Sequence, residues 1–179
     1  MDAHPRTGAV GGYVNEKYLP RQFPTIITLI RENVGIPKHP ASYVRNSAAI
    51  PVEQPAAAAL LVRRDAYEQV GGLDEQFFPA WYEDVDFCRR LKSAGWDIYF
   101  VPGAVFVHEG GYSAGALGPE SFLRAYYGNQ VRYVRKHMGS GAAAAIRVSI
   151  AIGMLGRMIA RPRSAKSYGK ALLGAIRGW

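Results

Sequence analysis

Apolar residues recur at helical spacing in five parts of the chain. Where this helical spacing of apolar residues is sustained and is bounded by capping residues and glycines, it predicts a helix. The predicted helices cover about residues 25–34, 65–70, 83–94, 120–138 and 142–160. The third has acids in its first turn and bases in its last turns, which complements the helix dipole.

Short apolar runs between these helices predict strands. The run at 8–12 reads as a buried strand that leads into a glycine turn, and the run at 56–62 follows a proline and precedes a better helix start. Two further strands are expected over 96–100 and 104–108, with Pro-Gly as a turn between them. Residues 36–55 carry four prolines and are expected to form a surface loop.

Composition and charge narrow the class of protein. With 179 residues and 49% hydrophobic residues, the chain can form one compact domain with a real core. One cysteine excludes an internal disulfide and fits a reducing compartment. Up to Glu120 there are 11 Lys/Arg against 14 Asp/Glu, whereas the rest has 11 Lys/Arg and no acid. Such a basic tail suggests an anionic partner: membrane lipid, a phosphorylated substrate or nucleic acid.

The helix over 142–160 carries the apolar part of this tail. It is apolar apart from Ser149, Arg147 and Arg157, and the two arginines lie about 80° apart around a helix. That pattern fits a helix lying in a membrane interface better than one spanning the membrane. The aromatics of 120–138 are at helical spacing and are expected to be packing residues, which makes nucleic acid an unfavoured partner.

Three polar features could carry chemistry. One is the loop at 71–75, whose glycines suit a turn that approaches a ligand and an ordinary helix C-cap equally well. Glu83 and Asp84 follow Trp81 and Tyr82 at a helix start, where a partly desolvated carboxylate could act as a general base toward a hydroxyl. Alternatively, the two acids only satisfy free amides of the first turn. His108 ends an apolar strand and could bind a metal, although such a histidine is more often a satisfied structural residue.

One further motif is discounted. The string Asp84-Val85-Asp86 matches a nucleotide-diphosphate metal motif, but its aspartates lie about 200° apart around a helix and do not converge.

Taken together, several segments resemble the acceptor half of family 2 glycosyltransferases, with the rhamnosyltransferase and galactofuranosyltransferase-like branch as the nearest. The resemblance covers roughly residues 5–138 and rests on five segments in the same order and spacing: residues 58–64, 70–78, 82–91, 95–96 and 101–108. It implies a GT-A fold, a Rossmann-like α/β sandwich, and transfer with inversion at the anomeric centre of the sugar.

The resemblance also assigns roles to residues. Asp84 would be the base that deprotonates the acceptor hydroxyl, supported by Glu83. Trp81, Tyr82 and Asp74 would line the acceptor pocket. His108 would bind a divalent metal, Mg or Mn, whose other ligands are expected from an N-terminal half that this sequence does not contain.

These assignments define the expected domains, function and location. Residues 1–138 are expected to be the acceptor-side half of a GT-A domain without the nucleotide-binding units, and 139–179 a basic amphipathic helical tail at a membrane interface. The expected function is inverting transfer from a nucleotide sugar to a glycan or lipid-diphosphate-linked acceptor in cell-envelope polysaccharide synthesis. The alternative is a catalytically inactive membrane-associated binding module or gene remnant. The expected location is the cytoplasm, with the protein bound peripherally to the anionic lipid on the inner face of the plasma membrane.

Overall fold

A computed structural model describes residues 1, 4–36, 48–109 and 112–179, so most of the predicted 36–55 loop lies outside the described residues. The chain divides into two compact units that interleave along the sequence. The sheet unit comprises Met1–Phe23, Pro40–Gln76 and Glu83–Gly110. The helical unit comprises Pro24–His39, Phe77–Tyr82 and Gly111–Trp179.

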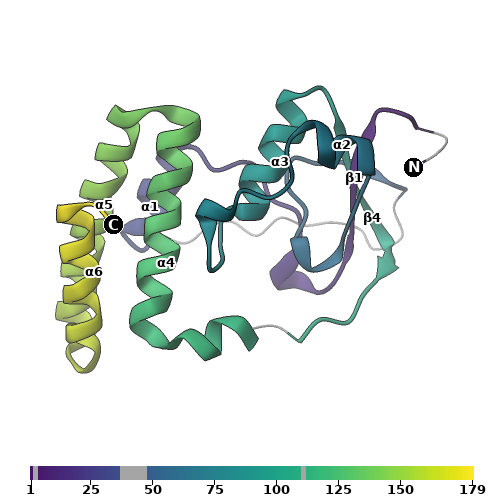
Figure 1. The fold of residues 1–179 in the computed structure, drawn as a ribbon. Coiled ribbons are helices and arrows are strands. Elements are labelled where there is room, and N and C mark those ends of the chain that lie inside the picture. Colours follow the sequence, from purple (N-terminus) through teal and green to yellow (C-terminus); the bar gives the residue numbers. More distant parts are fainter. Residues whose placement is uncertain (2–3, 37–47, 110–111) are drawn as a thin grey trace. The chain divides into compact units, whose positions relative to one another are not determined.

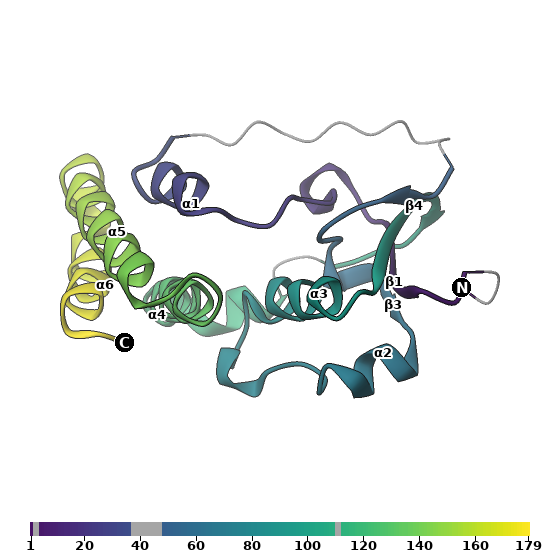
Figure 2. The same cartoon turned by 90° about the horizontal axis from the view of Figure 1, so that it is seen from above.

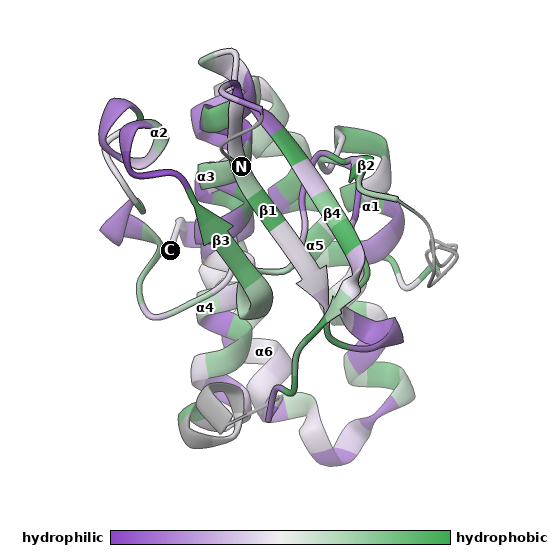
Figure 3. Cartoon of the chain, turned by 90° about the vertical axis from the view of Figure 1, so that its right-hand side faces the viewer, coloured by the Kyte–Doolittle hydropathy of each residue, from purple (hydrophilic) through white to green (hydrophobic). Residues whose placement is uncertain are grey.

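The part of the sheet unit that the structure describes is built on four strands. These are β1 (Thr7–Tyr13), β2 (Ile50–Pro51), β3 (Leu60–Val62) and β4 (Asp97–Val105), in the order β2-β4-β1-β3 (Figure 3). The central pair β1 and β4 is parallel, whereas β3 runs antiparallel to β1 and β2 antiparallel to β4. A mixed sheet with helices confirms the predicted α/β class.

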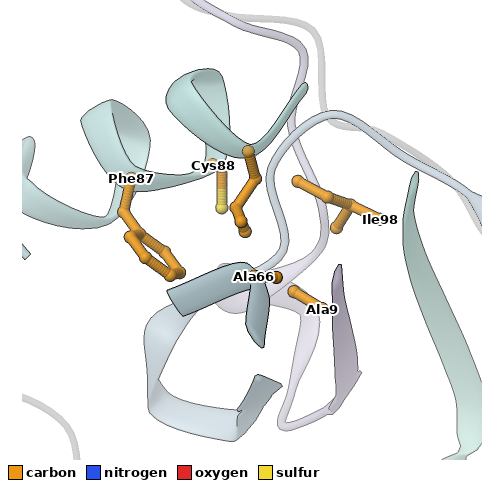
Figure 4. Packing of buried hydrophobic residues seen from close by; sticks show 6 residues of the cluster. Ala9, Ala66, Phe87, Cys88 and Ile98 are labelled. Carbon is orange, nitrogen blue, oxygen red and sulfur yellow. The ribbon is translucent and has the colours of Figure 1, made fainter. Parts of the chain in front are cut away.

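Two helices, α2 (Arg64–Gln69) and α3 (Glu83–Ser93), supply side chains to a buried cluster at the sheet. Figure 4 shows Phe87 and Cys88 of α3, Ala66 of α2, and Ala9 and Ile98 of the central strands around one apolar core. Burial raises the pKa of the Cys88 thiol to about 12, so this cysteine is a packing residue and not a reactive one.

Two strand predictions differ from the structure. The segments 96–100 and 104–108 form a single strand, because β4 continues to Val105 and residues 106–109 are not in a strand. Gly12 pairs with Val101 but Tyr13 pairs with Val105, so β4 accommodates extra residues in a bulge. Pro102 sits in this irregular stretch, where a strand tolerates a residue without an amide hydrogen.

The strand predicted over 56–62 is likewise shorter than expected. Ala57–Ala59 form a 3₁₀ turn, and only Leu60–Val62 join the sheet as β3. Three more 3₁₀ turns lie at Glu16–Tyr18, Glu75–Phe77 and Pro162–Ser164.

Gly11 lies in β1, which confirms the strand predicted at 8–12, and the strand continues to Tyr13 where a glycine turn was expected. A Cβ atom on Gly11 would lie 2.2 Å from the Cβ of Pro55. We therefore expect Gly11→Ala to destabilise the fold by about 1–3 kcal/mol through overpacking. Urea unfolding measures this loss, and Gly103→Ala, where a Cβ would meet nothing within 4 Å, is the control in the same sheet. Equal midpoints for the two variants would contradict this packing.

Within the described residues, the helical unit contains four helices: α1 (Ile26–Asn33), α4 (Tyr112–Met138), α5 (Ser140–Ala160) and α6 (Ala165–Arg177). Helices α4, α5 and α6 pack against one another, and α1 packs on α5 (Figures 1 and 2). The 120–138 prediction is confirmed for the main part of α4. An additional segment begins at Tyr112, and Gly118, with φ of 68°, breaks the helix before Pro119.

Helix α5 has the length and composition of a membrane-crossing helix, with a mean hydropathy of 1.6, and 33% of that stretch is buried. Its arginines have partners inside the unit. Arg147 donates to the carbonyl oxygens of Ala175 and Ile176 at 2.7 and 2.5 Å, and Arg157 donates to that of Asn33 at 2.7 Å. These carbonyls lie at the last turns of α6 and α1, so both arginines cap helix ends. The expectation was that the apolar face of this helix lies on the membrane and that the arginines point away from it, whereas the structure shows both arginines bound to other helices.

Candidate active site

Asp84 lies in the first turn of α3, and its carboxylate is held by groups of the sheet unit. One oxygen accepts from the backbone amide of Val85 at 2.8 Å. The other lies 3.5 Å from the side-chain nitrogen of Gln54, and the backbone amide of Ala57 is a further donor. The carboxylate therefore accepts a first-turn amide hydrogen, as the structural alternative expects, and it is also bound by a residue 30 positions away. Its role as a general base stays a prediction.

Burial and hydrogen bonding act on Asp84 in opposite directions. Loss of water destabilises the ionised carboxylate, whereas the amide and Gln54 hydrogen bonds stabilise it. Burial is the larger effect and raises the pKa of Asp84 above its ordinary value. A carboxylate with a raised pKa is a stronger base than an exposed aspartate, so this arrangement suits proton abstraction.

Gln54 and Ala57 are site residues that the sequence did not reveal. Gln54 is buried, and its backbone pairs with Arg21 through an isolated bridge. The only sequence signal was a proline-rich stretch, which predicts a loop and says nothing about what the loop contacts.

Two other predicted acids differ in their surroundings. Glu83 is half-buried in the same first turn of α3. Asp74 accepts from the backbone amide of Gln76 at 3.0 Å, which closes a local turn before the Glu75–Phe77 3₁₀ turn. The supporting role of Glu83 and the acceptor-pocket role of Asp74 stay predictions.

Asp86 has a structural role, in agreement with the discounted Asp-x-Asp motif. Its carboxylate is fully buried and accepts from the Nε of Arg90 at 2.8 Å. The same guanidinium donates to the carbonyl oxygens of Val70 and Gly72 at 2.5 and 2.7 Å. Arg90 therefore ties the Gly71-Gly72 turn to α3, and Asp86 neutralises its charge.

His108 follows the end of β4 and is exposed. Its ring lies edge-on to Tyr18, with the centroids 5.2 Å apart. Within the described residues no group of three or more His, Cys, Asp or Glu side chains could hold a metal ion. These residues therefore do not fit a metal site by themselves, and the role of His108 as a ligand stays a prediction.

Trp81 and Tyr82 belong to the helical unit and have unusual backbones. Their φ angles are 73° and 74°, in the left-handed region that residues other than glycine rarely adopt. Trp81 packs edge-on to Phe122, with centroids 4.7 Å apart. Tyr82 is buried, and its hydroxyl accepts from the side-chain nitrogen of Gln130 at 2.9 Å.

A buried polar network of the helical unit extends from this tyrosine. Gln130 accepts from the side chain of Asn33 at 2.9 Å, and Asn33 also donates to the hydroxyl of Ser149 at 2.9 Å. Burial raises the pKa of the Tyr82 phenol, so it stays protonated. The network fixes the strained segment, while the predicted contact of Trp81 and Tyr82 with an acceptor remains a prediction.

The comparisons with known proteins define the class. Residues 42–135 match the family described as "Glycosyltransferase like family 2", and this chain belongs to that family. The mixed sheet and helices agree with a partial GT-A α/β fold.

Individual relatives give a more specific comparison than the family does. The chain is 36% identical over 136 residues to the N-acetylglucosaminyl-diphospho-decaprenol L-rhamnosyltransferase of Mycobacterium tuberculosis, in strains CDC 1551 and H37Rv. The match covers 69% of this chain and 44% of that protein, so the chain spans less than half of this relative. An uncharacterised protein of Sinorhizobium fredii is 31% identical over 81 residues, which is 45% of this chain and 9% of that protein. No solved structure matches the chain significantly.

Proposed function

We propose that the chain carries the acceptor-side part of an inverting glycosyltransferase that acts in cell-envelope polysaccharide synthesis. The observation that carries this proposal is the Asp84 carboxylate, which lies at the start of α3 with a pKa raised by burial. Membership of family 2 supports the reaction class.

The chemistry needs one base. The acceptor hydroxyl oxygen forms a bond to the anomeric carbon while the bond from that carbon to the diphosphate oxygen of the donor breaks. The hydroxyl proton passes to Asp84, and the nucleoside diphosphate leaves with the bonding electron pair. Attack opposite the leaving group inverts the anomeric centre. Gln54 and the amides of Val85 and Ala57 orient the carboxylate for this transfer.

The substrate classes are proposed from the relative. Its name specifies a sugar linked through diphosphate to a polyprenol as acceptor and rhamnose as the transferred sugar. We propose the same kinds of substrate here: a nucleotide-activated sugar and a lipid-diphosphate-linked glycan. No step is assigned to the expected divalent metal, because the described residues do not form its site by themselves.

Sugar transfer can be measured with the full protein that the gene encodes. Purified protein is incubated with a nucleotide-activated rhamnose and a short-chain N-acetylglucosaminyl-diphospho-prenol. The expected product is the rhamnosylated acceptor, with its anomeric configuration inverted by NMR. Retention would contradict the mechanism. Acceptor binding without any transfer would favour the alternative of an inactive binding module, whose support is that amides already occupy the Asp84 carboxylate.

We also propose that the α5–α6 region lies on an anionic membrane surface as a peripheral contact on the cytoplasmic side. Helix α5 has an exposed apolar row with a four-three-four spacing, formed by Val148, Ile152, Leu155 and Ile159. Exposed Arg161 and Arg163 follow directly in the α5–α6 turn, and exposed Lys166 lies in the first turn of α6. An apolar row beside exposed bases is typical of helices at lipid interfaces.

Removing two of these charges is expected to weaken membrane binding. Arg161→Gln with Arg163→Gln should lower affinity for anionic vesicles by about 30-fold, because each basic residue near such a surface contributes about 1 kcal/mol. Ile159→Glu, whose side chain is 84% exposed, should weaken binding further. Co-sedimentation measures both, with Ile27→Glu on exposed α1 as control. Equal binding to neutral and anionic vesicles would refute the contact.

A further inference from the structure

The helical unit has an open groove of about 320 Å³ along α4, lined in part by Ser121, Arg124, Gly128 and Arg132. Arg124, Gly128 and Arg132 follow one another at intervals of four residues, so they share one face of the helix. Among the described residues, none that lines the groove has an acidic side chain. The described lining side chains therefore carry two positive charges and no negative charge.

Arg132 is pre-positioned at one end of this groove. It donates to the side-chain oxygen of Asn129 at 2.5 Å, and its guanidinium lies 6.0 Å from the ring centre of Phe77. Asn129 in turn donates to the carbonyl oxygens of Phe77 and Ala80, which fixes the segment beside the groove. A guanidinium held this way keeps further donors for a ligand, since arginine has five N–H groups.

Aromatic surface completes the groove. Phe78 is 83% exposed, and the indole of Trp179 packs on α4 and α6 where two glycines make room for it. A Cβ on Gly174 would lie 2.4 Å from the ring of Trp179, and one on Gly128 would lie 3.3 Å from it. Among the described residues, the buried indole nitrogen of Trp179 has no hydrogen-bond partner. An aromatic wall suits the sugar or prenyl group that is attached to a phosphate.

A neighbouring pocket of about 250 Å³ is less suited to an anion. It shares Arg124 and Trp179, but it also contains Glu120. Glu120 accepts from the amine of Lys170 at 2.6 and 2.8 Å, so its charge and that of Lys170 cancel. That pocket also contains Arg177, so the net side-chain charges of the two pockets are equal. The α4 groove differs in that none of its described lining residues has an acidic side chain.

We propose that this groove binds the diphosphate of the lipid-linked acceptor, with Arg124 and Arg132 on the phosphate oxygens and with Phe78 and Trp179 against the attached sugar or prenyl chain. Guanidinium groups match phosphate geometry, and such charge-assisted hydrogen bonds are strong. This inference rests on the proposed function, from which the lipid-diphosphate-linked acceptor is taken.

The test measures binding to the full chain by calorimetry. The salt concentration is about 150 mM, so that surface charges are screened as they are under physiological conditions. Three probes separate the sources of diphosphate: inorganic pyrophosphate, farnesyl diphosphate and a farnesyl-diphosphate-linked N-acetylglucosamine. The two lipid-linked probes are expected to bind more tightly than pyrophosphate. Arg124→Gln and Arg132→Gln should each weaken that binding at least tenfold. Arg135→Gln is the matched control, because it removes an exposed charge from α4 outside the groove.

The outcomes separate this inference from the proposed function. An equal loss of binding affinity in all three arginine variants would mean non-specific electrostatic attraction and would contradict a binding site in the groove. Unchanged binding in the Arg124 and Arg132 variants would contradict it as well. If the encoded protein transfers sugar but Arg124→Gln leaves the KM for acceptor unchanged, the inference fails and the function stands. If the groove binds lipid diphosphates while no transfer occurs, the inference stands and the function fails.

Discussion

Replacing Asp84 with asparagine is expected to lower kcat by about 10²- to 10⁴-fold, the range that a positioned general base contributes. Asparagine keeps the shape and can still accept from the amide of Val85, but it cannot take the proton of the acceptor hydroxyl. The measurement is the rate of transfer at saturating acceptor. Asp65→Asn is the control, because Asp65 is an exposed acid in the first turn of α2. Equal rates for the two variants would remove Asp84 from the mechanism.

The same substitution is expected to make the fold more stable at neutral pH. Folding raises the pKa of Asp84, so the folded state prefers the protonated carboxyl and ionisation above that pKa costs stability. The neutral asparagine side chain carries no such cost. The gain of Asp84→Asn should therefore be full above the folded pKa and should disappear below about pH 3.9, the ordinary aspartate pKa.

Denaturant unfolding at pH 7 and at low pH measures this difference. Lower activity together with higher stability at pH 7 would show that the variant loses a functional group and not its fold. A destabilised Asp84→Asn at pH 7 would instead mean that the amide and Gln54 hydrogen bonds outweigh burial. That result would assign Asp84 a structural role in the first turn of α3.

Replacing Arg90 with methionine is expected to be the most destabilising single change. It leaves the fully buried Asp86 carboxylate without its cation, and breaking such a pair costs about 3–5 kcal/mol. The carbonyls of Val70 and Gly72 also lose their donor. The midpoint of urea unfolding measures the effect. Arg64→Met is the control, because Arg64 forms an exposed pair with Glu68.

A second variant identifies the cause of that loss. Asp86→Asn combined with Arg90→Met removes the buried charge as well as its partner, so part of the lost stability should return. If the double variant is no more stable than Arg90→Met alone, the hydrogen bonds to Val70 and Gly72 carry the stability and the ion pair does not.

Local signals in the sequence predicted the helices well. The acids and bases at opposite ends of α3 placed it within a residue of its observed end, and Thr25 caps α1 as expected. Both follow from interactions within one turn of the chain. Strands were harder to predict, because their limits depend on pairing. The bulge that lets β4 continue past Pro102 is set by β1, which is about 90 residues away.

The candidate site shows the same difference between local features, which the sequence predicts, and long-range contacts, which it does not predict. The position of Asp84 at a helix start was visible in the sequence, because neighbouring residues determine it. Its contact with Gln54 was not, since a loop and a helix far apart in the chain create it. The arginines of α5 were interpreted from their angular spacing alone, but their partners are carbonyls at the ends of other helices. Periodicity shows which face a residue occupies and cannot show what packs against that face.

The pH dependence of kcat/KM tests the role of Asp84 most directly. If Asp84 takes the acceptor proton, the wild-type profile falls on the acid side with an apparent pKa above about 3.9, since burial raises the pKa of this carboxyl. Asp84→Asn should show a low rate without that acid limb, whereas Asp65→Asn should keep it. An acid limb shared by the wild type and Asp84→Asn would show that another group is the base.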